Sequence, residues 1–309
     1  MKLRREMMLL SVISIIFLAG CVRGGGEGPT AAGVIIKSFA PDVQSVDGGS
    51  DVVFSTDIQN IGVKKANNVK VLFFGLSNEW KTKDTTPQSF TFKLDTSVTS
   101  LAGADPQAGL KGEETIIELT LKAPPGKGTD VTYDTSVRVF YDYATVSDTL
   151  LRFVSSQYAK TAPNAQRGVV SSASTSGPLL VTTTARTSTI TSGTNFGRIQ
   201  FEIQNIGGGR VFTGGLDTNN NPVSLDSLTK IEVTGAKTCS GVSFDSDNVI
   251  RLTPEKTSLR LAGGKSKIVS CDVDLSNLVN FKDVGLNVTI SYSYFVDSAT
   301  TVTVLRGFE

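Results

Sequence analysis

From residue 34 onward, apolar and polar residues alternate in short runs that are separated by turn-forming residues. Two clear runs are DVVFSTDIQ at 51–59 and IQFEIQ at 199–204, where β-branched and aromatic residues recur at every second position. A period of two places these side chains on one face of a β-strand and polar side chains on the other. After residue 21 no run keeps a helical period for three turns, and only 97–110 suggests a short helical turn. The pattern therefore predicts an all-β protein.

A duplicated segment organises the chain. The pentapeptide IQNIG occurs at 58–62 and again at 203–207. Two further pairs of segments match in the same order, 110–126 with 261–277 and 135–155 with 286–308, at offsets of 144 to 151 residues. Three collinear matches indicate two homologous units, each of about seven short strands. We therefore expect two immunoglobulin-like β-sandwiches in tandem.

The unit boundaries follow from this repeat. We assign a first sandwich to 34–158 and a second to 178–309, joined by a linker at 159–177. The linker, AKTAPNAQRGVVSSASTSG, consists mainly of small and polar residues, which favours a flexible or lightly packed connection. We interpret the repeated Asn-x-Gly as a turn signature, because both residues tolerate a positive φ, and not as a binding motif.

These motifs together resemble the CARDB family, cell-adhesion-related immunoglobulin-like modules of bacterial and archaeal surface proteins. An N-x-G turn after the second strand is matched at 60–62 and 205–207, and a turn that begins with leucine and contains glycine before a later strand is matched by LKGE at 110–113 and LAGG at 261–264. The resemblance implies the immunoglobulin-like fold and a surface role, and it brings no catalytic residues.

The first 20 residues predict an export signal. A basic stretch with Lys2, Arg4 and Arg5 precedes the apolar run 7–19. Thirteen helical residues span ~20 Å, which is short of a ~30 Å hydrocarbon core. The sequence LAGC at 18–21 resembles a lipobox, in which the Cys21 thiol takes up a diacylglyceryl group, and two or more acyl chains give stable anchoring. The alternative is an ordinary signal peptide with a cysteine there by chance. Residues 21–33 would then form a flexible tether.

The chain has 3 cysteines, so a lipidated Cys21 leaves Cys239 and Cys271 as a pair. In an exported protein this pair predicts a disulfide. Two reduced, buried thiols are the alternative.

Charge and composition narrow the function classes. Without residues 1–20 the chain carries 27 basic and 28 acidic side chains, which does not favour nucleic-acid binding. The absence of histidine excludes Ser-His-Asp and Cys-His nucleophile systems and histidine-ligated zinc. We expect a protein that is not an enzyme and that uses no cofactor.

Two surface segments are candidate sites. DTNNNP at 217–222 places oxygen ligands at Asp217, Asn219 and Asn221, with Asp226 nearby, and this spacing indicates a candidate calcium site. An EF-hand would need glycine and glutamate where the chain has proline at 222 and leucine at 228, so a polar turn is the alternative. Asn287 begins an N-glycosylation sequon within a predicted strand.

The sequence as a whole indicates a lipid-anchored, extracytoplasmic protein with a structural, adhesion or protein-interaction role. Its partners would be the membrane, through the anchor, and a surface protein or glycan. One alternative is a carbohydrate-binding lipoprotein, for which Trp80, Phe90 and Phe92 are the aromatic candidates. Another is a filament subunit that exchanges strands between chains, which predicts an incomplete sandwich.

Overall fold

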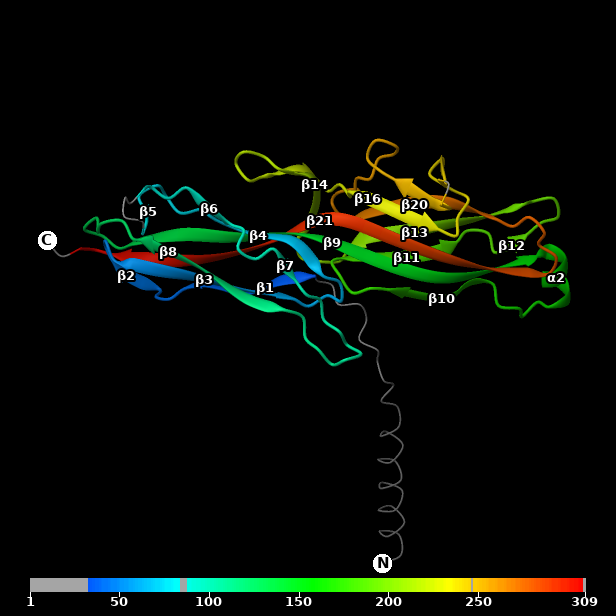
Figure 1. Cartoon of the computed structure of the whole chain (residues 1–309), viewed down its shortest axis with the longest axis horizontal. Coiled ribbons are helices and arrows are strands. Elements are labelled where there is room, and N and C mark those ends of the chain that lie inside the picture. Colours follow the sequence, from blue (N-terminus) through cyan, green and yellow to red (C-terminus); the bar gives the residue numbers. More distant parts are fainter. Residues whose placement is uncertain (1–32, 84–87, 246, 308–309) are drawn as a thin grey trace, which may run out of the picture.

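The computed structural model describes residues 33–83, 88–245 and 247–307, and its regular structure is almost entirely β-strand (Figure 1). The all-β prediction is confirmed. Within this described part, one helix occurs, α2 (Ser156–Thr161), and the Ser155 hydroxyl caps it by accepting a hydrogen bond from the Tyr158 amide. The helical turn expected within 97–110 is wrong. This segment is a short strand followed by a tight turn, in which the Asp105 carboxylate accepts two backbone N–H groups.

The strands are β1 (Val34–Pro41), β2 (Ser45–Asp47), β3 (Asp51–Asn60), β4 (Ala66–Phe74), β5 (Lys81–Thr82), β6 (Phe92–Asp95), β7 (Ser100–Leu101), β8 (Glu114–Lys122), β9 (Val131–Ser155), β10 (Gly168–Ser174), β11 (Leu179–Ala185), β12 (Thr189–Ile190), β13 (Phe196–Asn205), β14 (Arg210–Leu216), β15 (Pro222–Leu225), β16 (Lys230–Thr234), β17 (Thr238–Cys239), β18 (Val242–Ser243), β19 (Val249–Leu252), β20 (Ser266–Asp274) and β21 (Phe281–Leu305).

Among the described residues these strands form three sheets. A four-stranded sheet has the order β1-β3-β8-β5, and a five-stranded sheet has the order β11-β13-β20-β17-β18. The third sheet has twelve strands, with β15-β14-β21-β9-β4-β6 as its main path. The two smaller sheets pack against opposite halves of the large one, as shown by Phe39 of β1 against Phe73 of β4 and by Gly197 of β13 against Phe153 of β9.

Two long strands, β9 and β21, run along the long axis of the molecule (Figure 1). Each has 25 residues, and they pair antiparallel without a register shift from Phe281 opposite Val154 to Val304 opposite Val131. At ~3.3 Å per residue each strand is about 80 Å long. The expectation of short strands throughout is wrong here. The physical reason is in the sequence, since β9 contains neither glycine nor proline to end the strand.

The register relates β9 and β21 by a local twofold axis. Asp142 lies opposite Ser293, its own counterpart in the repeat, and Ser293 Oγ donates to Asp142 Oδ1 at 2.5 Å. On the buried face, four tyrosines surround this axis with ring centroids 5.7 to 6.3 Å apart: Tyr141, Tyr143, Tyr292 and Tyr294. The repeat found in the sequence is therefore also a symmetry of the fold.

Each long strand belongs to both sandwiches. Residues 136–142 of β9 pair with β4 of the first repeat, whereas 147–155 pair with β10 and β12. In β21, residues 287–291 pair with β16 of the second repeat and 303–305 pair with β2 of the first. The predicted linker 159–177 also contains β10, which is part of the large sheet. The two sandwiches thus exchange their closing strands and share one continuous apolar core.

The repeated IQNIG segment ends β3 and β13, and its asparagine organises the turn that follows. Asn60 is fully buried, and its Nδ2 donates to the carbonyls of Lys64 (2.8 Å) and Leu101 (3.0 Å), while its Oδ1 accepts from the Gly62 amide. Asn205 likewise donates to the Gly209 carbonyl and accepts from the Tyr294 hydroxyl. The expectation of a positive φ is wrong, because neither asparagine nor the following glycine has one. The turn after the motif is held by the hydrogen bonds of the asparagine amide side chain and not by a positive φ.

We predict that Asn60→Ala lowers the free energy of unfolding by about 2–4 kcal/mol, because it leaves buried carbonyl and amide groups without their partners. The neighbouring Gln59→Ala removes one contact, to the Gly112 carbonyl at 3.2 Å, from a half-buried side chain and should cost less than about 1 kcal/mol. Urea unfolding of both variants measures the difference. Equal losses would show that the asparagine has no special role.

The four central tyrosines predict alkaline unfolding. Burial raises the pKa of Tyr143 and of Tyr294 to about 12, and burial also holds the pKa of Tyr141 and Tyr292 well above the ordinary value. Because the unfolded chain ionises first, stability is fully present below about pH 10 and is lost as the pH rises toward 12. Phenolate absorbance at 295 nm should rise together with the loss of the β-sheet circular dichroism signal. Reversible ionisation of all tyrosines near pH 10, with the sheet signal intact, would contradict this.

Candidate functional site

Cys21 and the signal segment lie outside the described residues, so the anchor prediction is carried by sequence alone. In the part of the chain that the structure describes, no helix has both the length and the apolar character needed to cross a bilayer. The predicted tether at 21–33 likewise lies outside the described residues, apart from Gly33.

The predicted disulfide is confirmed. Cys239 of β17 lies directly opposite Cys271 of β20, with a Cα–Cα distance of 4.0 Å, and both cysteines are buried. The backbone hydrogen bond from Ser240 N to the Ser270 carbonyl places the cysteines at a position without hydrogen bonds, where opposed Cα atoms come closest. The bond therefore ties the short strand β17, which is paired over only two residues, to the edge of the second small sheet.

Two of the four calcium candidates, Asp217 and Asp226, have separate roles at the hairpin β14–β15. The Asp217 carboxylate accepts the backbone N–H groups of Asn219 and Asn221, each at 2.8 Å, and so stabilises the turn itself. Asp226 is held by Arg210, whose Nη2 donates to it at 2.8 Å, and this contact raises the pKa of Arg210. Across the described ranges, no group of three or more His, Cys, Asp or Glu side chains is arranged to hold a metal ion. The calcium site stays a prediction without a supporting contact.

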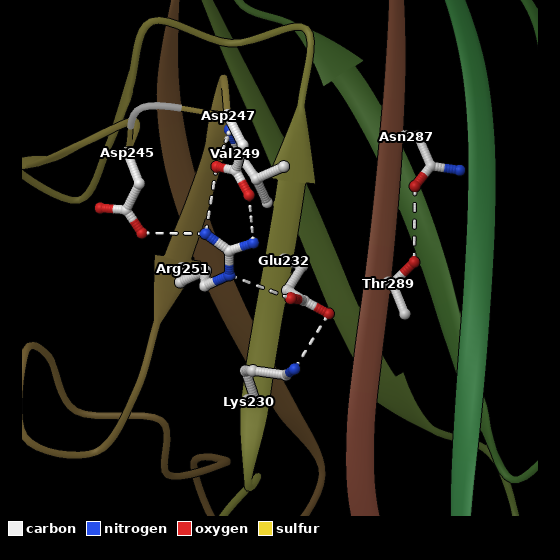
Figure 2. Close-up of polar contacts among 8 residues, drawn as sticks. All are labelled: Lys230, Glu232, Asp245, Asp247, Val249, Arg251, Asn287 and Thr289. Carbon is white, nitrogen blue, oxygen red and sulfur yellow. Dashed lines mark hydrogen bonds and ion pairs between the residues drawn. The ribbon is translucent and has the colours of Figure 1, made fainter.

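An acidic cluster beside β16 and β19 is neutralised by basic residues. The Arg251 guanidinium donates to Asp245, Asp247 and Glu232, while Lys230 forms an ion pair with Glu232 at 3.1 Å (Figure 2). The hydrogen bonds that Arg251 donates to Asp247 lower the pKa of the Asp247 carboxyl and raise the pKa of the Arg251 guanidinium. Because these side chains keep between 26% and 51% of their surface exposed, solvent screens the network and it contributes little to stability. Its carboxylates are already paired with Arg251 and Lys230.

Asn287 lies on β21, with Thr234 of β16 on one side and Asp148 of β9 on the other. Its Nδ2 donates to Asp148 Oδ1 at 2.7 Å, and Thr289 Oγ1 donates to its Oδ1 at 3.4 Å; Figure 2 shows the latter contact. A glycan on this nitrogen would disturb the bond to Asp148 within a strand that is paired on both sides. Glycosylation remains a prediction.

The aromatic platform considered for carbohydrate binding is largely wrong. Trp80 is fully buried between Phe54 and Tyr133, at ring-centroid distances of 5.9 and 5.6 Å, and Phe90 is buried as well. Phe92 alone of the three is exposed. Trp80 is therefore part of the core of the first sandwich.

The feature that sequence reasoning missed is an open edge on β21. Among residues 33–83, 88–245 and 247–307, β14 pairs with β21 up to Phe295 and β2 pairs with it from Ser45 opposite Thr303. No described strand pairs with 296–302 on the side away from β9. A cavity of about 240 Å³ lies beside this edge, lined by residues that include Val34, Val296 and Ser298. Its only sequence signal is indirect, namely that 296–302 (VDSATTV) is less apolar than the start of the strand.

Comparisons with known proteins leave the family open. No family model matches the chain, and no curated protein matches it. A DNA glycosylase of Pseudomonas fluorescens is 13% identical with a TM-score of 0.22, and the match covers 35% of this chain and 27% of that one. A chitinase of Bacillus thuringiensis is 9% identical with a TM-score of 0.21, covering 80% and 28%. This chain thus spans little more than a quarter of either protein, and at such TM-scores neither likeness carries an argument.

We predict that the double variant Cys239→Ala and Cys271→Ala unfolds with about 3–4 kcal/mol less stability, given a sequence separation of 32 residues. Urea unfolding measures the loss. A reducing agent should destabilise the unmodified protein by a similar amount and leave the double variant unchanged. An unchanged midpoint in the double variant would show that β17 is held by packing alone.

Proposed function

We propose that this protein is a lipid-anchored, extracytoplasmic spacer that carries two immunoglobulin-like sandwiches and binds another surface protein. The observation that carries the anchoring is LAGC at 18–21, placed after a basic and then apolar segment and before a glycine-rich stretch. The buried disulfide between Cys239 and Cys271 supports an oxidising compartment outside the cytoplasm.

The spacer role is supported by the ladder between β9 and β21. Two independent domains on a flexible linker would move relative to each other. Here an unbroken ladder from Val131 to Val154 crosses both sandwiches, so bending the molecule would break backbone hydrogen bonds. Such a body transmits position and force over about 80 Å from one end to the other.

The interaction role is supported by the resemblance to CARDB modules and by surface composition. The chain after residue 20 is close to neutral, so partner recognition would depend on shape and backbone pairing more than on charge. Two segments that fall between the matching parts of the repeat, 88–109 in the first half and 213–230 in the second, are the surfaces we assign to it. No catalytic step is part of this proposal.

We predict that Cys21→Ser prevents incorporation of a fatty-acid label and moves the protein from the membrane fraction to the soluble extracytoplasmic fraction. The serine hydroxyl is a much weaker nucleophile than the thiol, so the acyl group is not transferred. The double variant Cys239→Ala and Cys271→Ala serves as the matched control and should keep the label. Equal labelling of the Cys21→Ser protein would refute lipidation at this residue.

A further inference from the structure

The local twofold axis makes the two halves of the molecule directly comparable. Residue 142 of β9 corresponds to 293 of β21, and the pairing of the two strands obeys this correspondence throughout. Each strand should therefore have the same neighbour on its outer edge. The second half of β9 has β10 there, with Ala173 opposite Asp148 and Ser171 opposite Leu150. The second half of β21 has no described neighbour at the equivalent place, and this is the open edge.

Backbone groups on this open edge are left without partners in the described chain. Thr303 N donates to the Gln44 carbonyl, away from β9, and hydrogen-bonding direction alternates along a strand. Asp297, Ala299 and Thr301 therefore direct N–H and C=O groups to the same side. Their counterparts in β9 are Val146, Asp148 and Leu150, which are paired with Thr175 and β10.

Side-chain burial gives a second, independent sign of a missing neighbour. In β9 the inward-facing Thr145, Ser147 and Thr149 are buried, with exposures of 0%, 0% and 4%. Their counterparts in β21 are Val296, Ser298 and Thr300, and all three are only half-buried. Burial resumes at Val302, where β2 approaches. The first sandwich thus lacks one strand that the second possesses.

The occupant follows from chain connectivity. In the second half, the strand that fills the slot is β10, which directly precedes β11 and is joined to it by residues 175–178. β1 is the counterpart of β11, because Val34 lies opposite Asn60 as Leu179 lies opposite Asn205. The segment that precedes β1, separated from it by residues 31–33, is GEGPT at 26–30.

We propose that residues 26–30 of the same chain dock on the open edge of β21 as an additional antiparallel strand. The correspondence places Thr30 opposite Asp297, Gly28 opposite Ala299 and Gly26 opposite Thr301. Thr30 then occupies the place of Thr175, whose amide donates to the Val146 carbonyl at 2.8 Å and whose hydroxyl accepts from the Val146 amide at 3.0 Å.

The one proline of the segment is compatible with this register. Pro29 takes the place of Ser174, which lies opposite Ser147 at a position whose N–H points away from the neighbouring strand. Proline is tolerated on edge strands at such positions. Docking also shortens the free tether to residues 22–25, so residue 21 lies within ~18 Å of Gly26 by chain length alone. Gly26 in turn lies one strand spacing, about 5 Å, from Thr301. Residue 21 is thereby held near the end of the molecule where β21 ends, whether or not Cys21 is acylated.

Disulfide trapping tests the register in the chain without residues 1–20 and with Cys21→Ser. The pair Pro29→Cys with Ser298→Cys should form an intrachain bond, as should the positive control Ser174→Cys with Ser147→Cys, whose strands already pair. The matched control Pro29→Cys with Ser147→Cys should stay reduced, because β10 occupies that edge. A disulfide-linked dimer through Pro29→Cys and Ser298→Cys would show that a second copy supplies the strand, and would overturn the proposal.

Amide hydrogen exchange gives a readout without added cysteines. In the same chain, amides of Asp297, Ala299 and Thr301 should exchange at least ~100-fold more slowly than in the variant Gly28→Pro, which removes an N–H directed at β21. Glu27→Pro, at a position directed away, should retain the protection. Amides of Val296, Ser298 and Thr300 face β9 and should be unaffected in every variant. Fast exchange at Asp297, Ala299 and Thr301 in the unmodified chain would also overturn the proposal, and it would leave the lipid anchor untouched.

Discussion

The antiparallel ladder between β9 and β21 is the interaction on which the rest of the structure depends. Its 25-residue strands cross both sandwiches, and every sheet contact of the large layer is built outward from them. Because side chains alternate along a strand, one register decides which face is buried over the whole length of the molecule. A slip of one residue would turn the central tyrosines to solvent in both halves together. The two repeats are therefore bound into one body by backbone pairing and a common core.

Twofold symmetry explains both the repeat in the sequence and the exceptions to it. Asn60 and Asn205 hold equivalent turns, and each turn donates a backbone N–H to a tyrosine hydroxyl of the shared centre, Lys64 N to Tyr143 and Gly209 N to Tyr294. The halves differ where one has an element that the other lacks. The disulfide between β17 and β20 belongs to the second half alone, and the buried Trp80 belongs to the first. The open edge of β21 is the third difference, and unpaired backbone groups on such an edge can pair with another strand.

Most of the polar side chains that the sequence marks as candidate ligands form hydrogen bonds or ion pairs within the fold. Asp217 closes a hairpin turn, Asp226 is paired with Arg210, and the carboxylates around Arg251 are neutralised locally. Carboxylates that already accept strong hydrogen bonds from backbone amides or guanidinium groups have little capacity left for a ligand. Backbone edges are consequently the more available recognition surfaces, because recognition there uses main-chain hydrogen bonds and makes few demands on particular side chains.

The sequence by itself determined the β class, the duplication and the cysteine pair, because alternation, collinear motifs and an even cysteine count are local signals that do not need a partner. It also contained the signal for the long strand β9, since no glycine or proline interrupts 129–155, although short strands were expected there. The tertiary structure alone decided that the closing strands pass into each other's sandwich, that Trp80 is a core residue, and that Asn60 acts through its amide. The physical reason is that pairing partner, burial and hydrogen-bond geometry are set by segments about 150 residues apart in the chain, and these meet only when both long strands have found a common register.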